Sequence, residues 1–315
     1  MFNAERFVNE QIEELKARIK GKAIIACSGG VDSTVAAVLA SRAVGDRLLT
    51  VYVNNGFMRK GETEAVGKMF DGLGVSYRLV DASDEFFAAM KGVTDPERKR
   101  KIIGERFIRV FERTAKEFGA KYLVQGTIAP DWIESGDGVR DVIKSHHNVG
   151  GLPKDMDMDL VEPLRDLYKD EVRVVARYLN VQVAERQPFP GPALAIRVLG
   201  EATPESVSIV REACAIVEEE IEQASAAGKM TRPWQYFAVL LPCQSVGVQG
   251  DNRAYGRTIA VRSVESIDGM SAAYSRIPHE VLERISVRLT NEMKSDVNRV
   301  VYDITNKPPA TVEWE

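Results

Sequence analysis

The sequence has 315 residues, of which 44% are hydrophobic and 28% charged, which is typical of a soluble globular protein of one or two domains. Its net charge of −4 argues against a general nucleic-acid binder. No apolar run approaches the roughly 20 residues that span a membrane, and the N-terminus lacks a signal-peptide core. Three scattered cysteines without a C-x-x-C pair indicate neither a zinc site nor a disulfide framework, so we expect a cytoplasmic protein with no nucleic-acid or membrane partner.

The first predicted unit is a strand, a glycine turn and a helix. After an amphipathic helix over 7–19, an apolar run rich in β-branched residues predicts a buried strand over 23–27. An alanine-rich helix follows from Thr34 to about Ala43 and stops near Gly45. Between strand and helix lies the loop Ser28-Gly29-Gly30-Val31-Asp32-Ser33.

This loop points several backbone N–H groups and the positive end of a helix dipole at one place, which predicts an anion site. Its two adjacent glycines allow a sharp turn and a close approach of an anion to the backbone. The serine hydroxyls are further donors, and Asp32 offers a carboxylate for Mg²⁺. The spacing is neither that of G-x-x-x-x-G-K-S/T nor that of G-x-G-x-x-G. The alternative is a purely structural turn capped by Ser28.

Alternating strands and helices continue to about residue 125. Apolar strands are expected over 48–53, 75–80 and 121–125, with helices over 63–73 and 102–118 between them. This alternation predicts an α/β fold with a doubly wound parallel sheet. Ligands of such sheets bind at the carboxyl ends of the strands.

A basic run precedes the last of these helices. Asp95 is a candidate N-cap with Pro96 at the first helical position, and four basic residues follow over 98–101. On composition alone, such a run is a solvated helix face.

Residues 128–159 lack periodicity, which is unusual inside a compact domain and indicates a lid or binding loop that closes over a nucleotide. A flexible surface loop is the alternative. The adjacent His146 and His147 suggest metal ligands, but neighbours in sequence rarely face one centre, so metal binding is the weaker interpretation.

A smaller α+β unit is expected towards the C-terminus. Three prolines and a glycine over 187–192 exclude a helix or a central strand and predict a rigid connector. We therefore expect a domain over 1–195, with the lid at about 128–159, and a second domain over 196–315. The elements expected in the second domain are helices from 203 and over 280–293, and strands over 236–241, 258–264 and 300–304.

The loop in this setting resembles the pyrophosphate loop of the ATP pyrophosphatases, which cleave ATP between the α- and β-phosphates and transfer AMP to a substrate oxygen. With five further motifs in the same order, nearly the whole chain resembles the ATP pyrophosphatase part of GMP synthetases. These motifs lie at 99–104, 144–153, 188–197, 246–251 and 307–315.

The resemblance implies an adenine nucleotide alpha hydrolase-like sheet, a C-terminal dimerisation domain and a two-step reaction. The C2 carbonyl oxygen of xanthosine monophosphate (XMP) attacks the α-phosphate of ATP and pyrophosphate leaves; ammonia then displaces AMP and gives GMP. The resemblance also implies Mg²⁺ and a homodimer through the C-terminal domain. No glutaminase precedes the loop, so ammonia is expected from a separate glutamine amidotransferase subunit, as in archaea.

The same resemblance assigns roles residue by residue. The implied catalytic residues are Asp32, Asp131, Glu134 and Lys144, of which the last three belong to the lid. The implied ligands of ATP and its pyrophosphate are Ser28, Gly29, Gly30, Val31, Asp32, Ser33 and Thr34, with Asp32 also the Mg²⁺ ligand. The implied XMP ligands are Arg100, Gln244, Lys307, Thr311 and Glu313.

Other functions are compatible with the loop. NAD synthetases and tRNA-thiolating enzymes share it, but the first lack the Lys-Pro-Pro terminus and the second usually show paired cysteines or a basic RNA surface. A catalytically inactive nucleotide-binding regulator is the alternative from another class. The intact Ser28, Asp32, Ser33 and Lys144 favour the enzyme.

Overall fold

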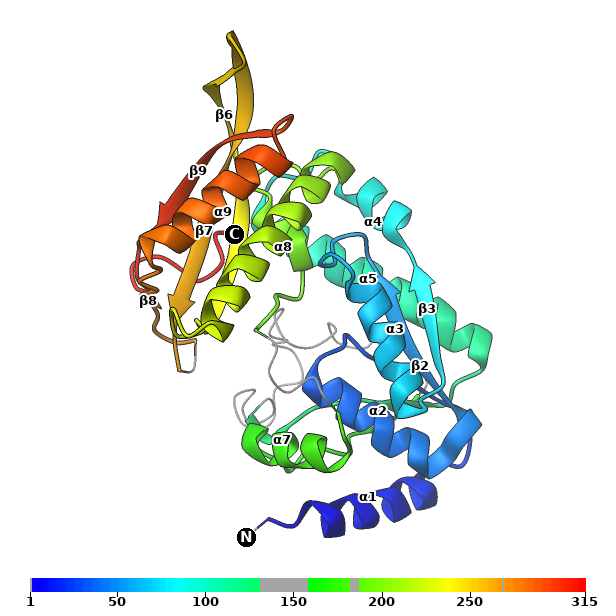
Figure 1. Ribbon diagram of the computed structural model, residues 1–315. Coiled ribbons are helices and arrows are strands. Elements are labelled where there is room, and N and C mark those ends of the chain that lie inside the picture. Colours follow the sequence, from blue (N-terminus) through cyan, green and yellow to red (C-terminus); the bar gives the residue numbers. More distant parts are fainter. Residues whose placement is uncertain (1, 131–157, 182–186, 268) are drawn as a thin grey trace. The chain divides into compact units, whose positions relative to one another are not determined.

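The structure is a computed structural model that describes residues 2–130, 158–181, 187–267 and 269–315. The chain divides into two compact units, each with its own sheet (Figure 1). Unit 1 contains residues 1–55, 61–83 and 103–186. Unit 2 contains residues 56–60, 84–102 and 187–315.

A five-stranded parallel sheet with the order β3-β2-β1-β4-β5 forms the centre of unit 1. Ile24 of β1 lies opposite Leu49 of β2 and Leu123 of β4, and β1 is buried on both faces because helices cover it. The predicted doubly wound sheet is confirmed. Its strands are β1 (Ala23–Ala26), β2 (Leu48–Asn54), β3 (Tyr77–Asp81), β4 (Tyr122–Val124) and β5 (Asp159–Val161).

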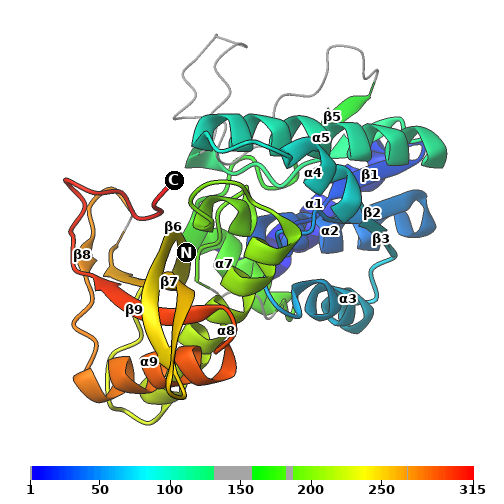
Figure 2. The same ribbon diagram turned by 90° about the horizontal axis from the view of Figure 1, so that it is seen from above.

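Helices cover both faces of this sheet. The chain runs from β1 through β2 to β3 in one direction and then returns to β4, and right-handed crossovers therefore place helices on opposite faces. Figure 2 shows α5 on one face and α2 with α3 on the other, and α1 and α7 pack against α2. The helices are α1 (Ala4–Arg18), α2 (Val31–Val44), α3 (Glu62–Leu73), α5 (Pro96–Phe118, with residues from 103 onward in unit 1) and α7 (Lys169–Tyr178).

The predicted start of the basic run is confirmed: α5 begins at Pro96, Arg98 N donates to Asp95 Oδ1 at 2.8 Å, and the helix continues through 102–118. Two other features differ from the sequence-based expectations. Strand β5 and helix α4 (Ser83–Met90) were not predicted. Both are too short for a periodic signal: β5 has three residues, and only one of them is buried.

Unit 2 is built on a long antiparallel hairpin. Strand β6 (Gln235–Gln249) pairs with β7 (Asn252–Glu265), which also pairs with β8 (Ala273–Tyr274) and, in parallel, with β9 (Val297–Asp303). The predicted α+β composition is confirmed. Helices α8 (Pro204–Ala226) and α9 (His279–Glu292) pack against each other and against this sheet (Figure 1). The proline-rich connector over 187–192 is followed by a short 3-10 helix, Ala193–Arg197, whose five residues are all buried.

Helix α8 supplies the centre of this unit. Its apolar residues at spacings of three and four are buried, as the sequence predicts; Val207, Val217 and Ile221 are fully buried. Its Glu220 carboxylate is also buried, where it accepts hydrogen bonds from Arg284 (2.8 Å) and Arg288 (3.1 Å) of α9. Although α5 and α8 each have 23 residues, neither they nor any other described helix is long and apolar enough to cross a membrane.

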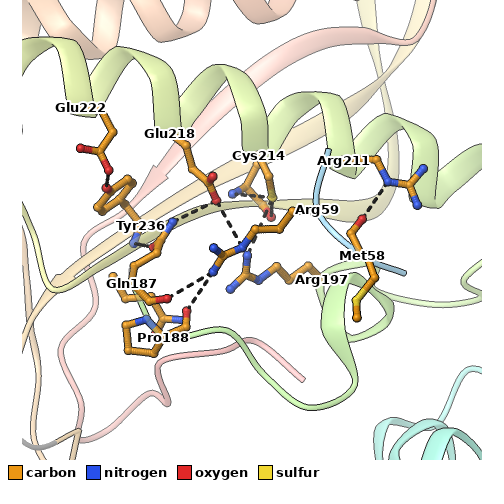
Figure 3. A network of polar contacts seen from close by, with 12 residues as sticks. Met58, Arg59, Gln187, Pro188, Arg197, Arg211, Cys214, Glu218, Glu222 and Tyr236 are labelled. Carbon is orange, nitrogen blue, oxygen red and sulfur yellow. Dashed lines mark hydrogen bonds and ion pairs between the residues drawn. The ribbon is translucent and has the colours of Figure 1, made fainter. Parts of the chain in front are cut away.

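The segment 56–60 follows β2 in sequence but belongs to unit 2. The Arg211 guanidinium on α8 donates to the carbonyl oxygen of Met58 at 2.8 Å. Arg59 donates to the carbonyl oxygen of Gln187 at 3.3 Å, and its guanidinium lies 3.9 Å from the Glu218 carboxylate (Figure 3). Two arginines thus fasten this segment to α8 and to the connector.

Candidate functional site

The pyrophosphate loop lies between β1 and α2 in unit 1. The helix begins at Val31, three residues earlier than expected, and Gly30 is its N-cap without any side-chain cap. Ser28 is therefore not the cap of this helix, as the structural alternative supposed. Thr34 N donates to Gly30 O at 3.0 Å as the first bond of the helix. The amides of residues 31 to 33 precede that bond, so they face outwards as the donors of a helix N-terminus.

Two serine hydroxyls flank the loop at Gly30. A Cβ atom at Gly30 would lie 3.4 Å from Ser28 Oγ and 4.0 Å from Ser33 Oγ. The space that a side chain would fill is therefore bordered by hydroxyl donors as well as by the first amides of α2. This is a cradle for the oxygens of an anion, at the positive end of a helix dipole.

Close backbone contacts require glycine on two sides of the loop. Gly29 has a φ of +79°, and a Cβ atom there would lie 2.9 Å from Val66 Cγ2. Gly126 follows β4, and its Cβ atom would lie 2.9 Å from the carbonyl carbon of Asp32 and 3.0 Å from Ser33 N. Because β1 has β2 on one side and β4 on the other, the loop occupies the switch point of the sheet, where such folds bind ligands.

A buried thiol, that of Cys27, contacts two hydroxyls at the start of α2. Cys27 Sγ lies 3.4 Å from Ser33 Oγ and 3.5 Å from Thr34 Oγ1. Burial raises the pKa of the Cys27 thiol, so it stays protonated. The thiol is thus a weak donor that helps to orient the hydroxyls, and it is poorly suited to be a nucleophile.

Polar groups also line the neighbouring end of the sheet. Asn54, the last residue of β2, donates through Nδ2 to Asp81 Oδ1 at 3.3 Å. Ser83 donates to the same oxygen through its amide (3.0 Å) and its hydroxyl (2.7 Å). These groups follow β2 and β3 at the carboxyl edge that also carries the loop.

The predicted lid residues Asp131, Glu134 and Lys144 lie outside the described residues, as do His146 and His147. Of the predicted Mg²⁺ site, the described part is Asp32, which is half-buried in the first turn of α2. Within the described ranges, no three His, Cys, Asp or Glu side chains gather to hold a metal ion. Asp32 therefore fits Mg²⁺ only together with other oxygen ligands, such as those of a bound phosphate.

The predicted XMP ligands belong to unit 2, and three of them lie on the segment 304–315, hereafter the C-terminal strip. Thr311 Oγ1 donates to the carbonyl oxygen of Glu313. Lys307 Nζ donates to the carbonyl oxygen of Gly269 at 2.7 Å, and Lys307 pairs with Ala272 through main-chain bonds.

Arg100 contacts the end of the same strip. Its guanidinium donates to the main-chain oxygen of Glu315 at 2.5 Å and to the Glu97 carboxylate at 2.6 Å. The neighbouring Lys99 is completely buried and donates to the Glu315 carboxylate and to the carbonyl oxygens of Ala195 and Val198. The interpretation of the basic run as a solvated face is thus wrong for Lys99.

Glu313 is engaged within the protein. The Arg197 guanidinium donates to both oxygens of its carboxylate (3.1 and 2.8 Å), and Gln235 Nε2 donates to one of them at 3.0 Å. Arg197 also lies over the rings of Phe237 and Phe189, with 4.0 and 5.2 Å to the centroids. In this structure the Glu313 carboxylate anchors the strip, and its contact with XMP stays a prediction.

Gln244 lines a cavity of about 220 Å³ in unit 2. It is exposed and follows an irregularity in the pairing of β6 with β7. The lining also includes Cys243, Arg257 and Val198, and the Val198 carbonyl accepts from Lys99. The cavity is therefore connected through one residue to the anchor of the strip, although its lining includes none of the other predicted XMP ligands.

Sequence reasoning missed three cations that hold the strip, Lys99, Arg197 and Arg262. The signal was present for two of them, because Arg262 follows the apolar run 259–261 and Arg197 follows the apolar run 193–196. A lone arginine in such a run predicts a buried partner. Burial alone lowers the pKa of Arg197, but the Glu313 carboxylate outweighs it and raises the pKa above the usual value.

The comparisons with known proteins cover both units. A family described as GMP synthase C terminal domain matches residues 219–314, and one described as NAD synthase matches residues 2–118. A subunit of the GMP synthase (glutamine-hydrolyzing) of Methanopyrus kandleri is 61% identical, with 100% of both chains covered. The corresponding GMP synthase subunit of Pyrococcus furiosus is also 61% identical, over 99% of this chain and 97% of its own. A solved NMN synthetase from Francisella tularensis has a TM-score of 0.48 at 14% identity over 95% of this chain and 98% of its own, and it supports no conclusion.

The contact at Gly126 predicts a loss of ATP affinity on substitution. Gly126→Ala inserts a methyl group against the backbone of Asp32 and Ser33, and such overpacking typically costs about 1–3 kcal/mol. If the start of α2 shifts to relieve it, ATP affinity in calorimetric titration falls by roughly five- to a hundredfold. Gly72→Ala, with no heavy atom within 4 Å of the new methyl group, is the matched control and should bind like the wild type. Unchanged affinity in Gly126→Ala would contradict the cradle.

The burial of two cysteines predicts selective thiol labelling. Cys27 and Cys214 are buried, which raises the pKa of both thiols, whereas Cys243 is exposed. The native protein should therefore react with one equivalent of a thiol reagent such as dithionitrobenzoate, and with three after denaturation. Cys243→Ser should remove the fast reaction, because burial keeps the reagent away from the other two thiols and raises their pKa. A fast thiol remaining in Cys243→Ser would contradict the burial of Cys27 or of Cys214.

Proposed function

This chain belongs to the family of these glutamine-hydrolyzing GMP synthase subunits, and we propose on that basis that it converts XMP to GMP at the expense of ATP. The NAD synthase match is limited to residues 2–118, whereas the GMP synthase relatives cover the whole chain. The single observation in the structure that carries the proposal is the hydroxyl and amide cradle over Gly30, which fits the pyrophosphate part of ATP.

The loop acts in the first step. The C2 carbonyl oxygen of XMP forms a bond to the α-phosphorus, and the bond from that phosphorus to the bridging oxygen of pyrophosphate breaks. Negative charge then grows on the leaving pyrophosphate. The amides of the first turn of α2 are fixed donors for that charge, and such preorganised donors are usually the largest contribution to catalysis. The Ser28 hydroxyl adds a further donor, and the Ser33 hydroxyl, which donates to Gly30 O at 3.3 Å, adds another when it rotates toward the phosphate.

The second step replaces the activated oxygen. Ammonia forms a bond to C2 of the adenylated intermediate, and the bond from C2 to the adenylate oxygen breaks as AMP leaves with its electron pair. Asp131, Glu134 and Lys144 remain the proposed lid residues that contact ATP. Asp32 is the proposed Mg²⁺ ligand, and a bound Mg²⁺ neutralises charge on the phosphates.

The strip and the basic residues beside it form the proposed XMP site. Lys307 has two amine hydrogens beyond the one donated to Gly269, and Arg100 brings a guanidinium to the end of the strip. Cations of this kind suit the phosphate of a nucleoside monophosphate. Gln244 and Thr311 supply neutral donors and acceptors.

The relatives are named as one subunit of a glutamine-hydrolyzing enzyme. Such a name supports a partner that hydrolyses glutamine, and we propose that it delivers ammonia to this chain in the cytoplasm. We also propose a homodimer through residues 196–315. Exposed apolar side chains on the β6–β7 hairpin support it: Val248 is 78% and Tyr255 is 64% exposed, which is unusual for a surface that stays in water.

The proposed reaction predicts strict dependence on XMP. With ATP, Mg²⁺ and ammonium, the purified chain should release AMP and pyrophosphate in equal amounts only when XMP is present, and GMP should form in the same amount. Glutamine should not replace ammonium, because that step belongs to the partner. Release of AMP without XMP, or no release at all, would refute the function, and glutamine-dependent GMP formation would refute the division of labour. Ion-pair chromatography measures AMP and GMP, and a pyrophosphatase-coupled phosphate assay measures pyrophosphate.

The proposed XMP site predicts a selective defect when Lys307 is changed. Lys307→Met keeps the length of the side chain but removes its charge, and a charge-assisted hydrogen bond contributes about 1.5–3 kcal/mol. The KM for XMP should therefore rise by roughly ten- to a hundredfold, with the KM for ATP unchanged. Lys229→Met, which removes a surface lysine paired with Glu280, is the control. An unchanged KM for XMP in Lys307→Met would remove this residue from the site.

A further inference from the structure

The C-terminal strip is held without a hydrophobic core of its own. Of residues 304–315, all of which the structure describes, none is buried; Ile304 is 64% and Trp314 is 37% exposed. The strip follows β9 and forms no helix or strand. Apolar burial, the usual reason for a segment to keep one conformation, therefore does not explain its order.

Arg262 holds the C-terminal strip by hydrogen bonds to its main chain. It lies in β7, opposite Asp303 of β9, and its side chain is completely buried. Its guanidinium donates to the carbonyl oxygens of Thr305 (2.5 Å) and Thr311 (3.0 Å) and, more weakly, of Val312 (3.4 Å). The same group pairs with the Asp303 carboxylate at 3.2 Å.

These contacts join the two ends of one loop. Thr305 enters the loop and Thr311 leaves it, so the guanidinium fixes the distance between them. Inside the loop, Ala310 N donates to Asn306 O at 3.0 Å, and Lys307 is held by Ala272 and Gly269. The position of the Lys307 amine is therefore set by a residue that lies 45 positions earlier and does not reach the surface.

Burying a guanidinium costs free energy unless its N–H donors are paired. Only the planar five-donor geometry of arginine can donate to three carbonyls and a carboxylate together. A lysine in its place keeps the charge and the pair with Asp303 but cannot reach all the carbonyls. The arrangement is thus sensitive to geometry rather than to charge.

We propose that Arg262 is a positioning residue for the nucleotide site: by joining Thr305 to Thr311 it holds Lys307 where the substrate phosphate binds. This inference rests on the proposed function, since it assumes that Lys307 contacts XMP. Arg262 itself has no contact with substrate.

The test compares Arg262→Lys with wild type in the ammonium-dependent assay. The KM for XMP should rise about tenfold or more, while kcat and the KM for ATP change by less than about threefold, because ground-state binding of one substrate is lost. Arg284→Lys is the matched control: it alters another arginine that pairs with a buried carboxylate of unit 2 but has no contact with the strip. That variant should keep the wild-type KM for XMP. An equal rise of both KM values, or none, overturns the proposal.

A double variant separates positioning from general damage. If Arg262 acts through Lys307, then Arg262→Lys combined with Lys307→Met should have the KM for XMP of Lys307→Met alone, whereas independent effects multiply and overturn the proposal. If Arg262→Lys does not fold, Asp303→Asn weakens the same guanidinium contact and should raise the KM for XMP in the same selective way; no rise overturns the proposal. XMP dependence of the wild type is measured first, so a failure of the proposed function is recognised separately.

Discussion

The structure of unit 2 depends on buried ion pairs. Lys99, Arg197 and Arg262 are completely buried, and each has a carboxylate partner on the strip or beside it, at Glu315, Glu313 and Asp303. Removing a cation from water costs several kcal/mol, which only well-placed partners offset. The strip and the interior beneath it therefore stabilise each other. Without the strip, Lys99 and Arg197 would lose their carboxylate partners and Arg262 its carbonyl acceptors, and without these cations the strip would have no anchor.

The two proposed phosphate sites use different kinds of donor. In unit 1 the donors are backbone amides and hydroxyls, which are fixed by glycine contacts at Gly29 and Gly126 and carry no net charge. In unit 2 the donors are full cations on long side chains, which need other residues to hold them still. Fixed dipoles suit a group whose charge grows during the reaction. Full cations suit a phosphate whose charge stays constant.

Much of unit 1 could be predicted from the sequence, because its strands and helices carry strong periodic patterns. The loop over 28–33 was placed correctly between strand and helix, although α2 begins at Val31 rather than at Thr34. Strand β5 was missed because it is short and mostly exposed. The roles of Asp131, Glu134 and Lys144 stay predictions, since these residues lie outside the described part of the chain.

The contacts of unit 2 were harder to foresee because their partners are remote in sequence. Arg197 and Glu313 are 116 positions apart, and Lys99 and Glu315 are 216 apart. No local pattern pairs such residues. The contact of Glu313 with XMP stays a prediction, and the sequence did not indicate that its carboxylate accepts from Arg197 and Gln235.

The interleaving of the two units has a consequence for how the chain can be divided or exchanged. Unit 2 needs residues 56–60 and 84–102 in addition to everything from 187 onward. A fragment cut at the proline-rich connector would lack Arg59, which fastens the connector, and Lys99, which anchors Glu315. The C-terminal part is therefore not a portable module. A recombination event that swapped it between related genes would have to preserve complementarity with two inserts encoded far upstream.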